Sequence, residues 1–325
     1  MSSNLLSSTV WGASDLLLQI AERFRSLARE DFRILAVTEL LMKHYEYVPV
    51  EEILRFSRLR DDEVLYRLRN LSRDRLLVSS TKTLPTGRGY VLTTLGYDAL
   101  ALRALVDRGK LEAIGKPLGV GKESDIYEAL DSRGRRCAVK FHRLGRTSFR
   151  QTMRKRGYTV GRTHISWLYQ SRLSAEKEYT ALKTLHKAGV SVPRPIGHNR
   201  HTIVMGVIEG TELKFAEMED PKAIMLEILR NVRVAYLRAG LVHSDLSEYN
   251  VLVKADGKVL IIDWPQSVSV DHPNAMENLG RDVCNIIDCF ERKAGISLCE
   301  EAALEYVTGK RRTIAAQSFS MGLHT

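Results

Sequence analysis

The chain of 325 residues is poor in cysteine and has no long apolar run. Its four cysteines form no C-x-x-C pair, so neither a zinc site nor a disulfide framework is indicated, and we expect reduced core residues. No segment approaches the roughly 18 apolar residues that a membrane-spanning helix needs. The start, Met1–Asn4, lacks the basic residues of a secretory signal. These absences predict a cytoplasmic protein without a membrane partner. The four cysteines are Cys137, Cys284, Cys289 and Cys299.

Internal repeats and low-complexity segments are also lacking, whereas positive charge is in excess. The chain has 49 Lys and Arg against 39 Asp and Glu, a formal net charge of +10, and 44% hydrophobic residues. That apolar content is ample for packed cores in two or three domains. The excess charge suits a polyanionic partner such as nucleic acid.

The first hundred residues carry the pattern of a winged helix. Residues 50–57 and 61–71 predict two short helices around a turn, and residues 76–80 and 90–93 predict two strands behind them. Helical spacing directs Val64, Leu65, Leu68 and Leu71 to the core and predicts an outer face with Arg67, Asn70 and Arg73. Such a face contacts either nucleic acid or another protein, and the sequence leaves both alternatives open.

A glycine-rich segment and a lysine follow. Gly119 and Gly121 lie between two predicted strands and allow backbone N–H groups to approach phosphates closely. The strand Cys137–Lys140 directs Lys140 to the phosphates of ATP, as in the V-A-I-K pattern of kinases. In a helix that we expect to start near Ser171, Glu178 is the predicted partner of Lys140, and Glu176 is the alternative.

Residues 143–175 form the most basic stretch, without one Asp or Glu. Eight cations with interleaved aromatic residues predict an RNA or phosphate surface, where neutralised phosphates release counterions and bases stack. A solvated loop is the alternative. The cations are Arg143, Arg146, Arg150, Arg154, Lys155, Arg156, Arg162 and Arg172, and the aromatic residues are Phe149, Tyr158, Trp167 and Tyr169.

The central pattern of the chain is H-x-D-x-x-x-x-N at residues 243–250, followed by a strand that ends at Asp263. ATP phosphoryl transfer needs such a set: Asp245 orients or deprotonates the attacking oxygen, while Asn250 and Asp263 hold Mg²⁺ against the phosphates. Residues 251–260 predict a hairpin with a turn at Asp256-Gly257, which brings Asp263 beside Asn250.

Two further positions complete the predicted site. A strand from Thr202 runs into a hinge at Met205–Val207, where the backbone at Met205 and Val207 can bind an adenine edge. In a later helix, Asp282 either anchors the backbone of the catalytic loop or forms a surface ion pair with Arg281 and Arg292.

These patterns predict an α+β protein in which a winged-helix domain precedes a reduced, bilobal protein-kinase-like domain with a small β-rich lobe and a larger helical lobe. The expected organisation is a winged helix over residues 1–94, a connecting helix and linker over 95–116, a kinase N-lobe with a basic insertion loop over 117–209, a kinase C-lobe over 210–309 and a frayed tail over 310–325.

The combined motifs resemble the RIO family of atypical protein kinases, specifically its second subfamily with an N-terminal winged helix. The resemblance covers roughly residues 15 to 295 and rests on residues 119–125, 141–149, 242–250, 262–266 and 272–275. Position 244 is Ser where the family commonly has Gly, and Gly206-Val207 follow Met205 where an acidic residue often stands.

The resemblance implies ATP and Mg²⁺ as cofactors and a set of roles for this chain. Asp245 is then the catalytic aspartate, and Asn250 and Asp263 bind Mg²⁺. Lys140 and the loop around Ser124, with Gly119, Gly121 and Lys122, bind the phosphates, and Glu178 pairs with Lys140. The family acts in maturation of the small ribosomal subunit, with serine autophosphorylation and ATP hydrolysis, through a phosphoaspartate at the position of Asp263, as its reactions.

Only about nine residues separate Asp263 from the next predicted helix, and no A-P-E motif follows, so the peptide-docking platform of ordinary protein kinases is missing. We therefore expect an atypical serine/threonine kinase and ATPase whose nucleotide state controls its release from the pre-small-subunit particle and its rRNA, with a serine of a protein or of this chain as phosphate acceptor. The alternatives are a winged-helix nucleic-acid-binding regulator with a non-catalytic kinase lobe and a small-molecule phosphotransferase.

Overall fold

The computed structural model describes residues 24, 26–80, 87–145, 160–207 and 209–321. The chain forms two compact units. The first comprises Met1–Leu173 with Asn199–Thr202, and the second comprises Ser174–His198 with Ile203–Thr325.

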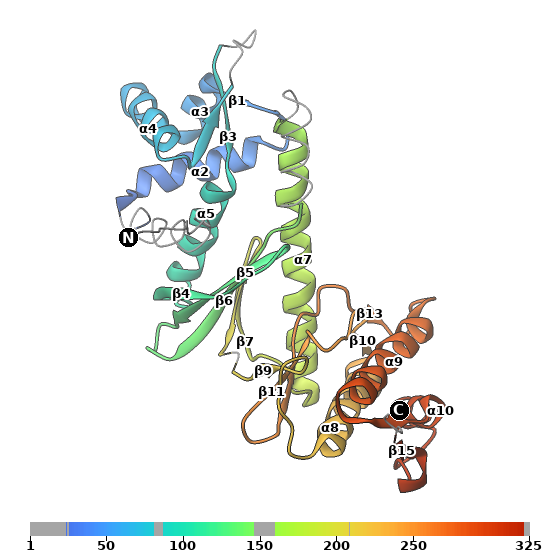
Figure 1. The fold of residues 1–325 in the computed structure, drawn as a ribbon. Helices are drawn as coiled ribbons and strands as arrows, with labels where there is room; N and C mark the ends of the chain where they lie inside the picture. The colour runs from blue at the N-terminus through green and yellow to red at the C-terminus, as the bar shows by residue number, and fades with distance from the viewer. Residues whose placement is uncertain (1–23, 25, 81–86, 146–159, 208, 322–325) are drawn as a thin grey trace, which may run out of the picture. The chain divides into compact units, whose positions relative to one another are not determined.

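The first unit begins with the winged helix that the sequence predicts. Three strands pair antiparallel in the order β1-β3-β2, and helices α2 to α5 accompany them (Figure 1). The core is made by side chains at helical spacing on the helices together with alternating strand residues, and Ile34, Leu68 and Leu92 have no exposed surface. The elements are α2 (Arg29–Leu41), β1 (Val48–Pro49), α3 (Val50–Ser57), α4 (Asp61–Arg73), β2 (Leu77–Ser79), β3 (Gly89–Leu92) and α5 (Thr94–Asp107).

Helix α5, expected as a connector, packs into the winged-helix core. Its Tyr97, Ala99 and Leu100 belong to the same cluster of buried residues as Ile34 and Leu68. The Thr93 hydroxyl accepts a hydrogen bond from the Gly96 amide, which caps the helix.

Strands β4 (Ala113–Val120), β5 (Ser124–Leu130) and β6 (Arg136–His142) follow as antiparallel neighbours. Strand β5 alternates between buried residues, Asp125, Tyr127 and Ala129, and half-buried ones. This period of two shows that one face of β5 is covered.

Helix α7 (Val160–Ala188) begins eleven residues before the predicted start near Ser171. Trp167 and Tyr169 are therefore helical and do not lie in a loop. Gly145 has a φ of +79°, and a Cβ there would lie 2.1 Å from the Trp167 ring. Only glycine satisfies both the left-handed backbone and this close approach.

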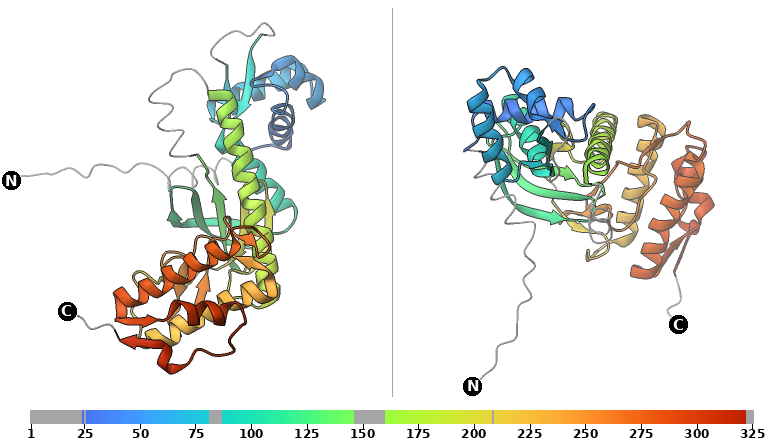
Figure 2. Two further views of the ribbon diagram at one scale, coloured as in Figure 1. Left: turned by 90° about the vertical axis from the view of Figure 1, so that its right-hand side faces the viewer. Right: turned by 90° about the horizontal axis from the view of Figure 1, so that it is seen from above.

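Apart from Asn199 at the end of β7 and Thr202 at the start of β8, which belong to the first unit, the second unit contains the remaining strands and helices. It has a sheet of order β12-β11-β9 and the pairs β10-β13 and β14-β15, and α8 and α9 lie side by side (Figures 1 and 2). The elements are β7 (Pro195–Asn199), β8 (Thr202–Gly206), β9 (Thr211–Glu212), α8 (Pro221–Val234), a π-helix (Ala235–Ala239), β10 (Leu241–Val242), β11 (Val251–Val253), β12 (Val259–Ile261), β13 (Val268–Ser269), α9 (Ala275–Ala294), β14 (Ile296–Leu298), α10 (Glu300–Val307), a 3₁₀ turn (Ala316–Ser318) and β15 (Phe319–Met321).

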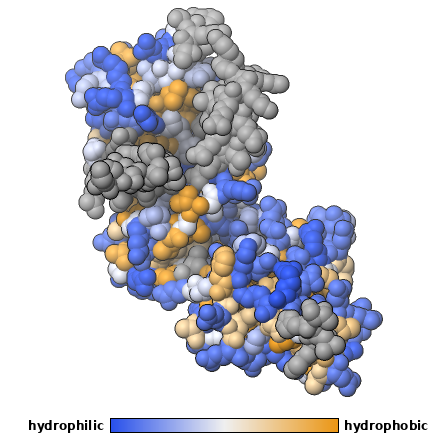
Figure 3. All heavy atoms as spheres, in the orientation of Figure 1, coloured by the Kyte–Doolittle hydropathy of each residue, from blue (hydrophilic) through white to orange (hydrophobic). Residues whose placement is uncertain are grey.

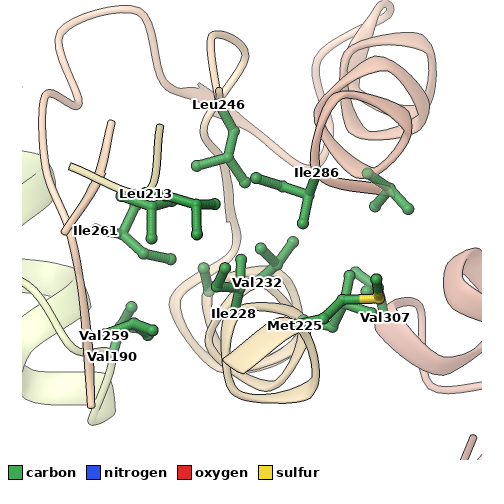
Figure 4. Packing of buried hydrophobic residues seen from close by; sticks show 14 of the residues in the cluster. Val190, Leu213, Met225, Ile228, Val232, Leu246, Val259, Ile261, Ile286 and Val307 are labelled. Carbon is green, nitrogen blue, oxygen red and sulfur yellow. The ribbon is translucent and has the colours of Figure 1, made fainter. Parts of the chain in front are cut away.

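One hydrophobic core fills this unit. Figure 4 shows Ile228 and Val232 of α8 beside Leu246 of the catalytic loop and Ile286 of α9. Burying a leucine or isoleucine side chain contributes about 1.5 to 3 kcal/mol, so this core holds the loop that contains Asp245 by its own Leu246.

Further expectations need correction. The tail does not fray throughout, because β15 pairs antiparallel with β14. Cys299 is exposed, whereas Cys137 and Cys289 are buried. The corrections for Arg67 and Arg143 are described below.

The predicted α+β class is confirmed, with a winged helix followed by strand-rich and helix-rich segments. No described helix is long and apolar enough to cross a membrane. On the face that Figure 3 displays, polar residues predominate over most of the described surface.

Candidate active site

The catalytic loop, residues 243–250, runs from β10 to β11 and is held by α9. The carboxylate of Asp282 accepts hydrogen bonds from the Ser244 amide (2.8 Å) and the Leu246 amide (2.9 Å). The Asn285 side chain donates to the Leu246 carbonyl oxygen (2.9 Å). Asp282 is therefore the loop anchor, one of the two predicted alternatives, and is not a surface ion pair.

Burial raises the pKa of the Asp282 carboxyl, although the hydrogen bonds from the two amides and the nearby His243 act in the opposite direction. The cost of burying this group is met by the two N–H donors, which is why an acidic side chain is stable on the inner face of α9.

Ser244 adopts the left-handed conformation, with a φ of 70°. Its hydroxyl accepts a hydrogen bond from the Asn278 side chain (3.1 Å), and its carbonyl accepts one from Arg281 (3.0 Å). The next residue, Asp245, is exposed. The strained turn thus projects the predicted catalytic carboxylate out of a fixed loop.

The sequence interpretation missed Asn278 and Asn285, and it named Arg281 only as an alternative ion-pair partner of Asp282. They lie with Asp282 at spacings of three and four on α9, which places all four on one face of the helix. A polar stripe at helical spacing, directly beside the apolar stripe of the same helix, was the signal that could have identified them.

The catalytic loop is also tied to the segment that carries Asp263. The Ile262 amide donates to the Asn250 carbonyl oxygen (2.9 Å), and His243 Nε2 lies 3.0 Å from the Ile262 carbonyl oxygen. The His243 ring lies 4.4 Å from the Trp264 ring. These bonds make Asn250 and the residue before Asp263 neighbours, as the predicted hairpin requires.

Asn250 and Asp263 offer an amide oxygen and a carboxylate, the donor types that suit a Mg²⁺ ion shared with phosphates. Asn250 Nδ2 donates to the Asp245 carbonyl oxygen (2.8 Å), which directs its own amide oxygen elsewhere as an acceptor. Asp263 has a φ of 66°. No group of three or more His, Cys, Asp or Glu in the described part of the chain could hold a metal alone. Mg²⁺ commonly binds one or two protein ligands and completes its shell with phosphate and water, and this pair supplies that number.

In the first unit, the glycine-rich tip joins β4 to β5. The Gly121 amide donates to the Ser124 carbonyl oxygen (2.8 Å), and Gly119, Gly121 and Lys122 are exposed. A Cβ on Gly119 would meet no atom within 4 Å, so its backbone faces open space. This is the accessible backbone that phosphates require.

Lys140 pairs with Ile126 in the register of β6 and β5 and is only 4% exposed. A lysine that merely improves solubility would lie at the surface, so burial removes that alternative. In the second unit, Glu178 is 1% exposed and Glu176 is exposed. Burial favours Glu178 over Glu176 as a functional carboxylate.

The predicted hinge lies at the end of β8. Met205 is buried, Val207 is half-buried, and the Gly206 amide donates to the Arg194 carbonyl oxygen (2.7 Å). The Gly206 N–H is therefore already used, which leaves the backbones of Met205 and Val207 as the candidates for an adenine edge.

The basic stretch is only partly described. Residues 146–159 and the side chains of residues 160–166 lie outside the described part of the chain. Arg143 contradicts the prediction of an unopposed cation, because it is buried and bonded to Asp98 and Asp125.

The face of α4 also differs from the prediction. Arg67 bonds to Asp31 (2.9 Å) and Glu63 (3.0 Å), so it joins α4 to α2 and is not available to a partner. Leu65, predicted to face the core, is 42% exposed, and the other exposed side chains of α4 include Tyr66 (61% exposed) and Arg69.

Comparison with known proteins agrees with this geometry. Residues 125–303 match the RIO domain, and residues 24–108 match the domain described as Rio2, N-terminal. The RIO-type serine/threonine-protein kinase Rio2 of Methanocaldococcus jannaschii is 43% identical over 277 residues, which are 82% of this chain and 100% of the relative. The serine/threonine-protein kinase rio2 of Schizosaccharomyces pombe is 39% identical over 269 residues, 82% of this chain and 77% of the relative.

A solved structure is similar as well. The Rio2 kinase–ADP/Mg²⁺–phosphoaspartate complex from Chaetomium thermophilum superposes with a TM-score of 0.76 at 34% identity and covers 89% of both chains.

Proposed function

Because this chain belongs to the Rio2 branch of the RIO serine/threonine protein kinases, we propose that it transfers the γ-phosphoryl group of Mg²⁺-ATP during maturation of the small ribosomal subunit in the cytoplasm. The observation that carries the catalytic part is the fixed loop of Asp245 and Asn250, hydrogen-bonded both to Asp282 and to Ile262, the residue before Asp263. Bound Mg²⁺-ATP supplies the phosphoryl group, and its Mg²⁺ neutralises the negative charge that develops on the phosphates during transfer.

In the second unit, Asp245 accepts the hydrogen bond of the attacking hydroxyl, and Asn250 and Asp263 hold Mg²⁺. The attacking hydroxyl belongs either to a serine, of another protein or of this chain, or to a water molecule. Met205 and Val207 offer backbone groups to adenine, and Glu178 is the proposed partner of Lys140.

In the first unit, Lys140 and the tip formed by Gly119, Gly121, Lys122 and Ser124 hold the phosphates. The backbone at the tip and the cations Lys122 and Lys140 supply positive charge to a triphosphate.

Asp263 has a second proposed role as a temporary phosphoryl acceptor. The complex from Chaetomium thermophilum contains a phosphoaspartate. An aspartyl phosphate hydrolyses when water attacks phosphorus and the Asp263 carboxylate leaves, so the whole cycle amounts to ATP hydrolysis. We propose that this hydrolysis releases the protein from the pre-ribosomal particle.

The proposed partner is the pre-small-subunit particle and its rRNA. The net charge of +10, the cations between Arg146 and Arg162 and the exposed Tyr66 and Arg69 of α4 support this proposal. Electrostatic attraction to phosphate and stacking on aromatic rings are the interactions such residues offer to RNA.

The test is single-turnover ATP hydrolysis by the full chain and its Asp245→Ala and Asp263→Ala variants, with and without purified small-subunit precursor particles. Turnover that requires both carboxylates and changes with the particle supports the proposal. Turnover indifferent to Asp245→Ala favours a non-catalytic kinase lobe, and efficient transfer to an added small molecule regardless of the particle favours a small-molecule phosphotransferase.

A further inference from the structure

Arg143, which directly follows β6, forms a buried fork between two carboxylates. Its side chain is 7% exposed. Nη1 and Nη2 donate to the two oxygens of Asp98 (2.6 and 2.9 Å), and Nε donates to Asp125 (2.9 Å). All three residues belong to the first unit, and each carboxylate is about as buried as the arginine.

One end of the fork lies in the winged helix. Asp98 is on α5, between Tyr97 and Ala99 of the winged-helix core. Its Oδ1 also lies 2.6 Å from Nε2 of His201, and the His201 ring stacks on Tyr97. Asp98 therefore has partners on several sides and little freedom to move.

The other end lies at the base of the glycine-rich tip. The Arg143 amide donates to the Glu123 carbonyl oxygen (2.6 Å), and Asp125 directly follows Ser124. Arg143 thus bonds to the chain on both sides of Ser124. Its backbone amide bonds to residue 123, and its side chain bonds to Asp125.

Stability alone does not account for such a cluster. A buried ion pair often contributes no more than well-packed apolar residues of equal volume, because each charge loses its hydration. The fork instead fixes orientation. A planar guanidinium with bidentate hydrogen bonds sets the angle between its two partners, whereas the ammonium group of a lysine does not.

We infer that Arg143 is a positioning residue, which fixes the tip at residues 121–124 against helix α5 and thereby sets the affinity of the tip for the phosphates of Mg²⁺-ATP. This inference rests on the proposed function of the tip. It makes the winged helix, through Asp98, a structural part of the nucleotide-binding element and not only a recognition domain.

The experiment measures the Kd of a fluorescent ATP analogue with Mg²⁺ and, separately, the melting temperature without nucleotide. Two variants of the full chain alter the fork: Asp98→Asn keeps the side-chain volume and one acceptor, and Arg143→Lys keeps the charge but cannot bridge both carboxylates. Asp98 serves as the reporter because it lies on α5, outside the glycine-rich tip.

Two matched controls make the same substitutions in ion pairs away from the tip. Arg67→Lys alters the pair with Asp31 in the winged helix. Asp131→Asn alters the pair with Arg135 at the opposite end of the β5-β6 hairpin. Both controls are expected to lower the melting temperature without changing the Kd.

At a temperature where every variant is folded, we expect Asp98→Asn and Arg143→Lys to raise the Kd about tenfold, since loss of a supporting bond misplaces the groups that contact ligand. The inference is overturned if Asp98→Asn or Arg143→Lys, when folded, binds the ATP analogue with the wild-type Kd and the two controls bind with that Kd as well. If Arg143→Lys does not fold, Asp98→Asn decides alone. Failure of the proposed function is distinguishable: then the wild type does not bind, or Lys140→Ala binds as the wild type does.

Discussion

The Nε2 atom of His243 lies 3.0 Å from the carbonyl oxygen of Ile262, which joins the catalytic loop to the segment that ends at Asp263. A carbonyl oxygen can only accept a hydrogen bond, so Nε2 of this imidazole carries the proton and donates it.

This bond can be removed with little change in shape. His243→Phe keeps a ring against Trp264 but leaves the half-buried Ile262 carbonyl without its donor, which we expect to cost about 1 kcal/mol of unfolding free energy. Urea denaturation measures the loss. His186→Phe, at an exposed position, is the control and should change little. Equal stability of both variants would show that the bond is unimportant.

The left-handed backbone at Ser244 predicts an unusual order of substitutions. Ser244→Gly should stay within about 1 kcal/mol of the wild type, because glycine relieves the strained φ while it loses the hydroxyl bond to Asn278. Ser244→Val should cost about 2 kcal/mol or more, since a β-branched residue resists a positive φ. Denaturant titrations measure both. Ser269→Val, at an exposed position in β13, should be nearly neutral. If the Ser244→Val variant proved as stable as the Ser244→Gly variant, the strain at this position would be contradicted.

Asp263→Ala should abolish Mg²⁺-dependent hydrolysis, with a fall of about a hundredfold or more, because it removes the proposed metal ligand and phosphoryl acceptor. The fold should persist, as a polar-to-Ala change in a site seldom unfolds a domain. Single-turnover rates and a thermal melt measure the two effects. Asp256→Ala, in the exposed turn of the neighbouring hairpin, should hydrolyse ATP normally. Normal hydrolysis by the Asp263→Ala variant would refute the metal assignment.

His201 predicts a loss of stability in mild acid. Burial lowers the pKa of its imidazole, although the hydrogen bond to Asp98 opposes the shift. Below about pH 6.5 the unfolded chain takes up a proton that the folded chain does not, so the unfolding free energy falls as the pH drops, by up to about 1.4 kcal/mol per pH unit. His201→Gln keeps a hydrogen-bond donor for Asp98 but does not titrate. In this variant the unfolding free energy, measured by urea denaturation, should differ less between pH 7.5 and pH 5.5 than in the wild type. His186→Gln should retain the wild-type difference. An unchanged difference in the His201→Gln variant would exclude His201 as the cause.

Replacement of Arg154, Lys155 and Arg156 by Glu should weaken RNA binding and flatten its dependence on salt. Each lost phosphate contact reduces the magnitude of the negative slope of log K against log salt concentration by about 0.7 to 0.9. Filter binding to a small-subunit precursor RNA at several salt concentrations measures the slope. Arg69→Glu tests the α4 face in the same assay. An unchanged slope for the triple variant would return that segment to the solvated-loop interpretation.

Local patterns determined much of this protein. The antiparallel β11-β12 pair, the helices and strands of the winged helix and the positions of Asp245, Asn250 and Asp263 followed from periodicity, turn residues and motif spacing, because these depend on residues close in sequence. The family resemblance rested on the same spacing and was confirmed by the domain matches.

Only the tertiary structure decided which charges are buried and which partners they meet. Arg67 and Arg143 look like surface cations in the sequence, yet Arg67 meets an aspartate 36 residues earlier and Arg143 meets one 45 residues earlier. Likewise, the Asp282 carboxylate binds amides 36 and 38 residues before it. The physical reason is that an ion pair or a buried hydrogen bond depends on the path of the chain through space, whereas helix and strand periods depend on the local backbone.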